Sequence, residues 1–437
     1  MTHEPTDVAP PATDLRSAYQ NCDAGPLPAD HPWYVDFGPA RGGSMVAQLA
    51  RRLELKPPGE VGARATWLQG VVVGPRGSGK SSDLRRLKAA VRGRYEVVLL
   101  DLNNEVNPAE FELAELVLAI AMGVERHMRE FVHKPLPDAL LARLVDWFSR
   151  VTREDLRTRV VEVGTNWGLL KSVLGMLKVQ SEARTTVVRE LKRYPGELVV
   201  ECNLLLAAAQ DLLEPGRELL VVVDNLDRYE PEVVNRSLCD GRDLLGALDT
   251  NLLLTPPVSL ALRPVGESLD SLYEPVVVLP TPALRGPKDP PETVKDPGRA
   301  LFTDALQRRI DLPAVFAEPE RAVPHLLALT GGSLRDLWEH LREAIVVASG
   351  PKVTVEDLDT ALRRRISLMR DQVDTSGMAE MVVEVHRTGR LHPGSDALEA
   401  VFRRWLLKYN SSDWYALHPY LLAMPRVQEL LAAKASP

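Results

Sequence analysis

Eight consecutive residues combine glycines, a lysine and a serine in a pattern that suits the binding of phosphate groups. They fit the spacing G-x-x-x-x-G-K-[ST] and are Gly74, Pro75, Arg76, Gly77, Ser78, Gly79, Lys80 and Ser81. Glycines let successive backbone N–H groups turn inward around phosphate oxygens, where the N-terminus of a following helix adds partial positive charge. Lys80 is expected to reach the β- and γ-phosphates of a nucleotide, and the Ser81 hydroxyl to ligate Mg²⁺. We include the next residue, Ser82, in the predicted binding loop.

The residues on either side of this loop have the patterns that a phosphate-binding loop requires. The apolar run at 68–73 predicts a buried strand, and the apolar residues between 84 and 91 lie on one face of a predicted helix. A strand, a glycine-rich loop and a helix in this order are the context of the motif. A glycine turn before an ordinary surface helix is the alternative, and the flanking strand and helix make it less favoured. The sequence therefore predicts a nucleotide-binding protein.

A second candidate for chemistry is the carboxylate that ends the apolar run at 218–224. A buried parallel strand of this kind delivers a carboxylate at the carboxyl edge of the sheet, and Asp224 is predicted to hold Mg²⁺ through water. The next residue is Asn225, at a position where many ATPases carry a glutamate that activates water. Asp227 is then the nearest candidate base, and slow hydrolysis is one expectation. Arg228 is either an arginine finger that acts on the nucleotide of a neighbouring subunit or the ion-pair partner of Asp227, and both interpretations remain open.

Arg335 is the candidate for contacting the terminal phosphate. It follows Gly331, Gly332 and Ser333, and Ser333 is the predicted N-cap of a helix. A basic residue in the first turn opposes the helix dipole, which favours a role outside the helix over an ordinary surface salt bridge. We therefore predict that Arg335 contacts the γ-phosphate.

Weaker candidates lie near these motifs. Ser259 and Arg263, on a strand predicted at 258–263, are further candidates for sensing the γ-phosphate. Tyr34 and Val35, upstream of the loop, are candidates for walling an adenine ring, and a hydrophobic plug at the sheet edge is the alternative.

The composition is that of a globular protein with enough material for two or three domains. The chain has 437 residues, of which 45% are hydrophobic and 26% charged, and its net charge is −7. This charge argues against wholesale coating by nucleic acid but leaves room for a local basic patch. The three cysteines are scattered without C-x-x-C spacing, so we expect no disulfide framework, no zinc site and a cytoplasmic location. No apolar run is long enough to span a bilayer, and we expect no signal peptide.

The order of the predicted elements divides the chain into four regions. They are a poorly ordered lead-in at 1–30, an α/β core at 31–298, a helical lid at 299–350 and a winged-helix-like domain at 351–437. The elements predicted in the core are strands at 68–73, 95–102, 218–224, 258–263 and 275–279, a helix at 231–251 and a helical insertion at about 109–213. Within the insertion, the segment at 167–178 is amphipathic, and cover by neighbouring helices is favoured over contact with a membrane surface.

The last region is predicted to combine helices with a hairpin. Thr354 and Asp357 have the spacing of a capping box at the start of a helix. Two strands are predicted at 401–407 and 414–417, on either side of a turn at 410–413. Helices followed by such a hairpin favour a winged-helix domain.

With these motifs placed, the chain resembles the AAA+/STAND branch of P-loop ATPases, and its bacterial members in particular. The resemblance rests on the loop at 74–81, on Gly-Gly-Ser-Leu-Arg-Asp-Leu at 331–337, and on a C-terminal segment with Lys-Tyr-Asn at 408–410, Trp-Tyr at 414–415 and His-Pro at 418–419. It implies a parallel-sheet P-loop fold of the ASCE type with a large helical insertion, a helical lid and a winged-helix-like domain. It also implies ATP and Mg²⁺ as cofactors, with ATP held between core and lid.

The function that the resemblance implies is a nucleotide-driven switch whose assembly is coupled to the nucleotide state. The expected partners are ATP or ADP and an effector protein, a homo-oligomer is one expected assembly, and bacterial relatives often act in signalling or anti-phage defence. The alternative is an initiator- or loader-like ATPase that binds DNA through its C-terminal domain. There, the triplet at 363–365 either contacts phosphates or lies on a solvated helix face. A third class, a nucleotide-binding scaffold without hydrolysis, follows from Asn225.

Overall fold

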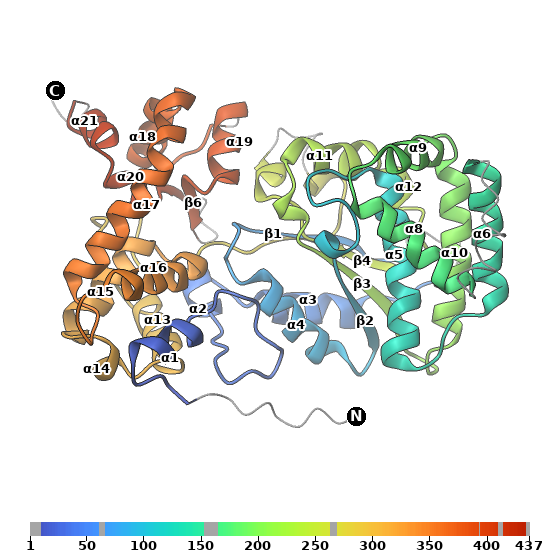
Figure 1. The fold of residues 1–437 in the computed structure, drawn as a ribbon, viewed down its shortest axis with the longest axis horizontal. Coiled ribbons are helices and arrows are strands. Elements are labelled where there is room, and N and C mark those ends of the chain that lie inside the picture. The colour runs from blue at the N-terminus through green and yellow to red at the C-terminus, as the bar shows by residue number, and fades with distance from the viewer. Residues whose placement is uncertain are drawn as a thin grey trace. The chain divides into compact units, whose positions relative to one another are not determined.

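The chain folds into two compact units whose segments alternate along the sequence (Figure 1). The computed structural model describes residues 10–60, 66–152, 165–262, 269–392, 394–409 and 414–433. The first unit is made of Met1–Gln48, Gly74–Arg86 and Val278–Pro437, and the second of Leu49–Val73 and Leu87–Val277. The predicted phosphate-binding loop therefore belongs to the first unit, and the strand before it belongs to the second.

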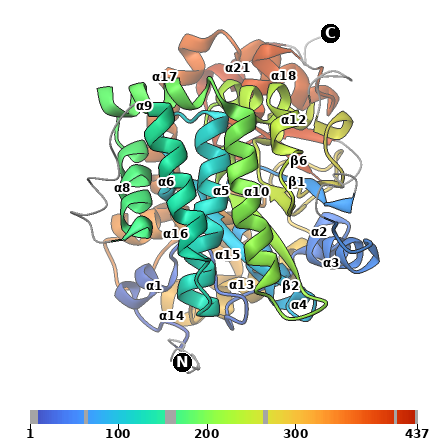
Figure 2. The same ribbon diagram turned by 90° about the vertical axis from the view of Figure 1, so that its right-hand side faces the viewer.

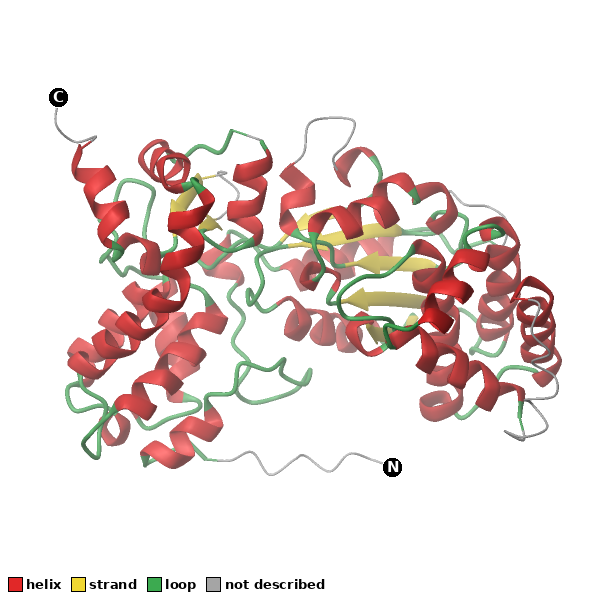
Figure 3. Cartoon of the chain, turned by 45° about the horizontal axis from the view of Figure 1, so that its top comes forward, coloured by secondary structure: helices red, strands yellow, loops and turns green. Residues whose placement is uncertain are grey.

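The second unit contains a five-stranded sheet with the order β2-β3-β4-β1-β5. Its strands are β1 (Gln69–Val73), β2 (Tyr95–Asp101), β3 (Glu218–Asp224), β4 (Asn251–Leu254) and β5 (Val276–Val278). Neighbours from β2 to β1 pair in parallel, as the arrows in Figure 3 show. Their apolar runs are buried because a parallel sheet is covered on both faces. The predicted α/β P-loop fold is confirmed, and β4 separates β1 from β3 as in the expected ASCE-type sheet.

One strand was predicted in the wrong place. Residues Val258–Leu262 form a short 3-10 helix, η6, instead of the strand expected at 258–263, and Arg263 lies outside the described residues. The fourth strand is β4, whose sequence resembles the end of a helix. Leucine favours helices in isolation, but Leu252, Leu253 and Leu254 are fully buried between β1 and β3. Pairing in the sheet therefore outweighs local propensity here.

The segment between β3 and β4 forms short helices rather than the single helix expected at 231–251. They are η4 (Leu226–Arg228), α11 (Pro231–Asn235), η5 (Arg236–Asp240) and α12 (Arg242–Leu245). Gly241 and Gly246 bracket α12. Because glycine loses the most backbone freedom in a helix, these two positions favour interruption of the expected helix.

A layer of helices fills the long segment between β2 and β3, which confirms the predicted insertion. These helices are α5 (Leu113–His127), α6 (Asp138–Thr152), α8 (Asn166–Lys178), α9 (Glu182–Leu191) and α10 (Pro195–Asp211). Figure 2 shows α6, α5 and α10 side by side, and α5 and α10 contact β3. The leucines of α8 are buried, and α8 packs against α6 and α9. Its apolar face is therefore covered by neighbouring helices. The sequence analysis favoured this interpretation over contact with a membrane surface.

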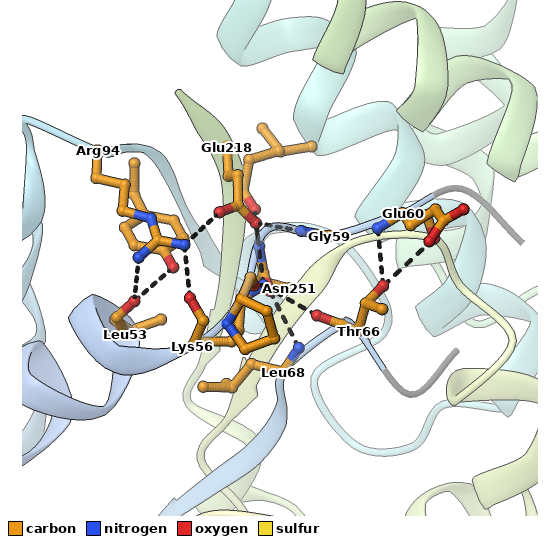
Figure 4. Close-up of polar contacts among 12 residues, drawn as sticks. Leu53, Lys56, Gly59, Glu60, Thr66, Leu68, Arg94, Glu218 and Asn251 are labelled. Carbon is orange, nitrogen blue, oxygen red and sulfur yellow. Dashed lines mark hydrogen bonds and ion pairs between the residues drawn. The ribbon is translucent and has the colours of Figure 1, made fainter. Parts of the chain in front are cut away.

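At the amino end of β3, Glu218 organises a group of polar contacts (Figure 4). Its carboxylate accepts hydrogen bonds from Arg94 (2.9 Å), Lys56 (3.1 Å), the Gly59 N–H (3.0 Å) and Asn251 (3.2 Å). Burial would raise the pKa of Glu218, but Lys56 and Arg94 hold that pKa below its ordinary value. These contacts fasten the segment before β1 to β3, to β4 and to the residue that precedes β2, so this carboxylate has a structural role.

The first unit contains a helical core that follows β5 in the sequence. Its helices are α13 (Gly298–Gln307), α14 (Leu312–Val315), α15 (Pro319–Thr330), α16 (Leu334–Val347) and α17 (Val355–Ser376). The large side chains fully buried among them include Phe302, Phe316, Leu337 and Leu341. Ser333 caps α16 by accepting a hydrogen bond from the Asp336 N–H, as predicted. Thr354 and Asp357 form the predicted capping box of α17.

Residues 10–30 are ordered, contrary to the expectation of a poorly ordered lead-in up to residue 30. Helix α1 (Leu15–Asn21) starts at Asp14, whose side chain accepts a hydrogen bond from the Ser17 N–H. Ala18 and Cys22 are fully buried in the helical core of the first unit. This helix was not predicted from the sequence, because the segment is rich in proline and alanine and only one short face of the helix is apolar. Two further helices follow, α2 (Gly38–Arg41) and α3 (Met45–Leu55).

The chain ends in helices around a two-stranded antiparallel hairpin. These elements are α18 (Ala379–Thr388), α19 (Ser395–Phe402), β6 (Leu406–Tyr409), β7 (Trp414–Leu417), α20 (Pro419–Leu422) and α21 (Pro425–Ala433). The first strand was predicted too early, because Val401 belongs to α19; the turn at 410–413 lies outside the described residues. The winged-helix assignment and the boundaries at 298 and 350 stay predictions. No helix in the described part of the chain is long and apolar enough to cross a membrane.

Two histidines of the first unit, the fully buried His340 of α16 and the half-buried His386 of α18, predict a loss of stability in mild acid. Burial lowers the pKa of His340 to about 4, and burial together with the charge of Arg285 lowers the pKa of His386 to about 4. His340 lies between the Tyr420 hydroxyl and the Leu358 carbonyl, both at 3.0 Å, and His386 accepts a hydrogen bond from the Leu417 N–H at 3.3 Å. The surroundings of both imidazole rings therefore favour the neutral form.

Since the pKa of each ring is lower in the folded than in the unfolded chain, the unfolded chain binds more protons between pH 6.5 and 4. The stabilisation is complete above pH 6.5 and falls through this window by up to about 3 kcal/mol for each ring. Urea unfolding at pH 7 and pH 5 measures this loss. His340→Gln should flatten the dependence, whereas His392→Gln, at an exposed position, should not. Equal midpoints at both pH values would contradict the prediction.

Candidate nucleotide-binding site

The predicted loop has the backbone conformation that phosphate-binding glycines allow. Gly77 and Gly79 have φ angles of 80° and 96°, in the left-handed region that favours glycine. The Ser78 N–H donates to the Pro75 carbonyl at 3.2 Å, and α4 (Lys80–Val91) begins at the end of the loop. The loop therefore turns directly into the N-terminus of a twelve-residue helix, whose partial positive charge favours an anion there.

Lys80 is held inside this loop. Its Nζ donates to the carbonyls of Gly74 at 2.7 Å and Pro75 at 3.0 Å, and the residue is only 5% exposed. Such an arrangement fixes the ammonium group at the turn where the terminal phosphates are expected. Ser81 and Ser82 follow in the first turn of α4, and the Ser82 hydroxyl accepts a hydrogen bond from the Leu27 N–H at 3.0 Å.

Arg335 lies against the same loop, although 258 residues separate it from Gly77. Its backbone N–H donates to the Gly77 carbonyl at 3.2 Å. A side chain at Gly77 would collide with the Cβ of Arg335, and one at Gly79 would lie 3.2 Å from Leu334. The first turn of α16 thus packs directly on the loop. The contact of Arg335 with a γ-phosphate stays a prediction.

Two polar groups at the loop suit a polar ligand. The Ser78 hydroxyl and the Nε of Arg335 are buried, and neither has a hydrogen-bond partner among the residues that the structure describes. Buried polar groups are normally paired, so groups left without a partner point to a ligand that supplies one. Phosphate oxygens, which only accept hydrogen bonds, fit these donors. The residues present therefore fit the triphosphate of a nucleotide.

Sequence reasoning missed a buried ion pair beneath the loop. Arg41 contacts Asp83 of α4 at 3.1 Å and also donates to the Ser78 carbonyl, and both side chains are under 10% exposed. Burial lowers the pKa of Arg41 and raises that of Asp83, while their attraction opposes both shifts. A single arginine in the glycine-rich run at 38–43 was the available signal. It was not interpretable alone because its partner lies 42 residues away.

Tyr34 also reaches α4. Its hydroxyl donates to Asp83 at 2.8 Å, and the guanidinium of Arg86 lies over its ring at 4.3 Å from the centroid. Burial, followed by the charge of Asp83, raises the pKa of Tyr34. Val35 packs into the helical core of the first unit. The role of these two residues beside an adenine ring stays a prediction.

In the second unit, polar residues gather at the carboxyl ends of adjacent strands. Asp224 ends β3, and its carboxylate accepts hydrogen bonds from the Asn225 N–H at 2.8 Å and the Thr255 hydroxyl at 3.2 Å. Asp227 is 7% exposed within η4, which also contains Arg228, and Ser259 is buried in η6. The ends of parallel strands share one edge of the sheet, and the loop starts from this edge because Gly74 directly follows β1.

The side chains that we expect to bind a magnesium ion offer oxygen atoms, which this ion prefers. Mg²⁺ is usually bound by one or two protein oxygens together with phosphates and water. The Ser81 hydroxyl and the Asp224 carboxylate are such donors, and they belong to the first and the second unit respectively. Their joint use by one ion stays a prediction.

Comparisons with known proteins give distant structural similarities only. No protein-family model matches the sequence, and no curated protein matches it. Among solved structures, the Walker-type ATPase PABY2304 of Pyrococcus abyssi matches over 94% of this chain and 99% of its own, with 13% identity and a TM-score of 0.40. Cdc6p from Pyrobaculum aerophilum matches over 89% and 94%, with 10% identity and a TM-score of 0.37. The Aeropyrum pernix ORC1 protein, solved in complex with DNA, matches over 89% and 91%, with 14% identity and a TM-score of 0.37.

Proposed function

We propose that this chain is a P-loop ATPase of the AAA+ type that binds ATP with Mg²⁺ and switches state according to the nucleotide. The observation that carries the proposal is the loop itself: Lys80 is fixed inside it, and Arg335 packs against Gly77 from α16. Two cationic side chains and a helix N-terminus then converge on one short turn. The STAND-type assignment, the effector partner and the cytoplasmic location belong to this proposal as expectations from the sequence.

Each residue of the site has a distinct task in this function. Lys80 offsets the charge of the β- and γ-phosphates, and the loop N–H groups and the α4 terminus orient them. Ser81 and Asp224 hold Mg²⁺, which when bound neutralises charge on the phosphates. Arg335 contacts the γ-phosphate, so the position of α16 depends on whether that phosphate is present.

The contacts of α16 extend this dependence to the C-terminal elements. Asp336, next to Arg335, is 1% exposed and pairs with Arg365 of α17, with Arg404 beyond α19 and with His418 before α20. A displacement of the first turn of α16 therefore disturbs contacts with three elements of the same unit. In the proposed switch, this is the route by which nucleotide state reaches the C-terminal elements.

DNA binding through the basic triplet is not favoured by the side-chain contacts. Arg364 pairs with Glu343 at 3.0 Å, Arg365 pairs with Asp336 and Glu339, and Arg363 donates to the Thr360 hydroxyl at 2.7 Å. Arginines engaged in this way have less charge available for phosphates. The triplet suits a helix face with internal ion pairs.

Arg335→Ala is expected to weaken binding of a non-hydrolysable ATP analogue about ten- to hundredfold and to affect ADP much less. The reason is that a charge-assisted hydrogen bond contributes roughly 1.5–3 kcal/mol, and ADP lacks the phosphate being held. Calorimetric titration of both nucleotides measures the difference. Arg342→Ala is the matched control, because Arg342 lies on the same helix and contacts the Tyr19 ring instead. Equal losses for ATP analogue and ADP would leave Arg335 a structural residue.

A further inference from the structure

A buried arginine contacts the backbone of the phosphate-binding loop. Arg41 is the last residue of α2 and is 5% exposed; one nitrogen of its guanidinium donates to the Ser78 carbonyl, and another donates to Asp83 of α4 at 3.1 Å. All three residues belong to the first unit. We propose that Arg41 is a positioning residue for nucleotide binding, which holds the loop in the conformation that accepts phosphate; this inference rests on the proposed function.

The contact with the Ser78 carbonyl sets the direction of the next backbone N–H. A trans peptide unit is planar, so the carbonyl of Ser78 and the N–H of Gly79 point in opposite directions. Since the carbonyl is directed at Arg41, the Gly79 N–H points away from the guanidinium, and it donates to no group in the part of the chain that the structure describes. Backbone N–H groups of such a loop bind phosphate oxygens. Arg41 therefore fixes a donor that a phosphate can use.

Asp83 joins this contact to the first turn of α4. Its backbone N–H donates to the Gly79 carbonyl at 3.1 Å. Its carboxylate accepts hydrogen bonds from Arg41 and, at 2.8 Å, from the Tyr34 hydroxyl, and the residue is only 6% exposed. The peptide between Ser78 and Gly79 is therefore held on both sides, by the guanidinium at its carbonyl and by the helix at the carbonyl that follows.

The backbone around Arg41 fixes the place from which its side chain reaches the loop. Helix α2 ends at Gly42, whose φ of 83° lies in the left-handed region, and the Ala40 carbonyl accepts a hydrogen bond from the Ala283 N–H at 2.8 Å. An arginine donates from several nitrogens in a rigid fork, whereas a lysine ammonium is a compact point charge. Two acceptors on different groups, a loop carbonyl and a carboxylate of α4, therefore suit an arginine at this position.

The alternative is that Arg41 only compensates the buried charge of Asp83. Removing Arg41 alone does not separate the two roles, because it also leaves a buried carboxylate without its cation. Combining Arg41→Met with Asp83→Asn does separate them. This double variant contains neither charge and has the net charge of the parent, and the asparagine oxygen can still accept the Tyr34 hydroxyl. The donor to the Ser78 carbonyl, however, is still missing.

We expect Arg41→Met to bind a non-hydrolysable ATP analogue and ADP about tenfold more weakly than the parent. The two losses should be equal, because the loop N–H groups hold phosphates that both nucleotides have. The urea midpoint of this variant should also fall. The double variant should regain most of the midpoint and keep the tenfold loss of affinity. Calorimetric titration and urea unfolding measure the two quantities.

The matched control is Arg86→Met. Arg86 lies on α4 like Asp83, and its side chain donates to the Ala29 carbonyl at 2.8 Å rather than to the loop. This variant loses one positive charge and one hydrogen bond to a carbonyl, as Arg41→Met does. Its affinity for both nucleotides should stay within about twofold of the parent.

The results that would overturn the assignment are distinguishable. Parent affinity in Arg41→Met would show that the loop does not need this contact. Affinity that returns together with the midpoint in the double variant would show that Arg41 only compensates Asp83. A loss for the ATP analogue alone would place Arg41 on the terminal phosphate instead. A parent protein that binds neither nucleotide would reject the proposed function, and the inference with it.

Discussion

Lys80→Ala is expected to lower the affinity for ATP at least about a hundredfold and to abolish turnover. The substitution removes the ammonium group that the Gly74 and Pro75 carbonyls hold inside the loop. Without it, the charge of the β- and γ-phosphates is no longer offset, and the loop N–H groups alone remain. Isothermal titration with ATP and a phosphate-release assay measure the two effects.

The control for this experiment is Arg85→Ala. Arg85 lies on the same helix, and its side chain donates to the Pro26 carbonyl rather than to a carbonyl of the loop. This variant also removes one positive charge, so it reports any general electrostatic effect on an anionic ligand. Unchanged affinity and turnover in Lys80→Ala would reject the loop as the nucleotide site. Equal losses in both variants would indicate a nonspecific effect of charge.

The loop and its flanks could be predicted because their signals are local. The strand before the loop, the glycine spacing and the start of α4 at Lys80 follow one another within about twenty residues. The same holds for the N-cap at Ser333 and the capping box of α17, where the donor and acceptor are three residues apart. Such short-range geometry is visible in the sequence of residue types.

The elements that could not be predicted depend on contacts distant in sequence. β4 forms because Leu252–Leu254 pair between two strands, and nothing local distinguishes this run from a helix end. The Arg41–Asp83 pair and the Asp101–Asn225 contact join residues 42 and 124 positions apart. A charged residue in one segment shows no preference for a partner in another until the fold brings them together.

The second large effect that we expect is a loss of stability on changing the buried carboxylate of Asp336, next to Arg335. Asp336 is 1% exposed, and its oxygens lie 3.0 Å from His418, 3.1 Å from Arg404 and 3.3 Å from Arg365. Burial would raise the pKa of Asp336, but Arg404 and His418 hold it well below its usual range. The charge of this residue therefore persists in the folded protein, where it compensates the charges of Arg404 and Arg365.

Asp336→Asn is expected to destabilise the first unit by about 3–5 kcal/mol. Replacing the carboxylate with a neutral amide removes the buried anion that Arg404 and Arg365 share, and breaking a buried ion pair by removing one partner is strongly unfavourable. Urea unfolding measures the overall loss, and hydrogen exchange in β6, β7 and α20 locates it. The matched control is Glu339→Gln on the same helix, where the carboxylate is 36% exposed and pairs with Arg365. That variant should lose less than about 1 kcal/mol.

The two variants also test whether Asp336 links the loop to the C-terminal elements. If α16 transmits nucleotide state, adding ATP analogue to the parent protein should change hydrogen exchange in β6, β7 and α20. The change should persist in Glu339→Gln and disappear in Asp336→Asn at concentrations that saturate the loop, because Asp336 joins the first turn of α16 to Arg404 and His418. An undiminished response in Asp336→Asn would show that the signal travels by another route and that Asp336 contributes to stability alone.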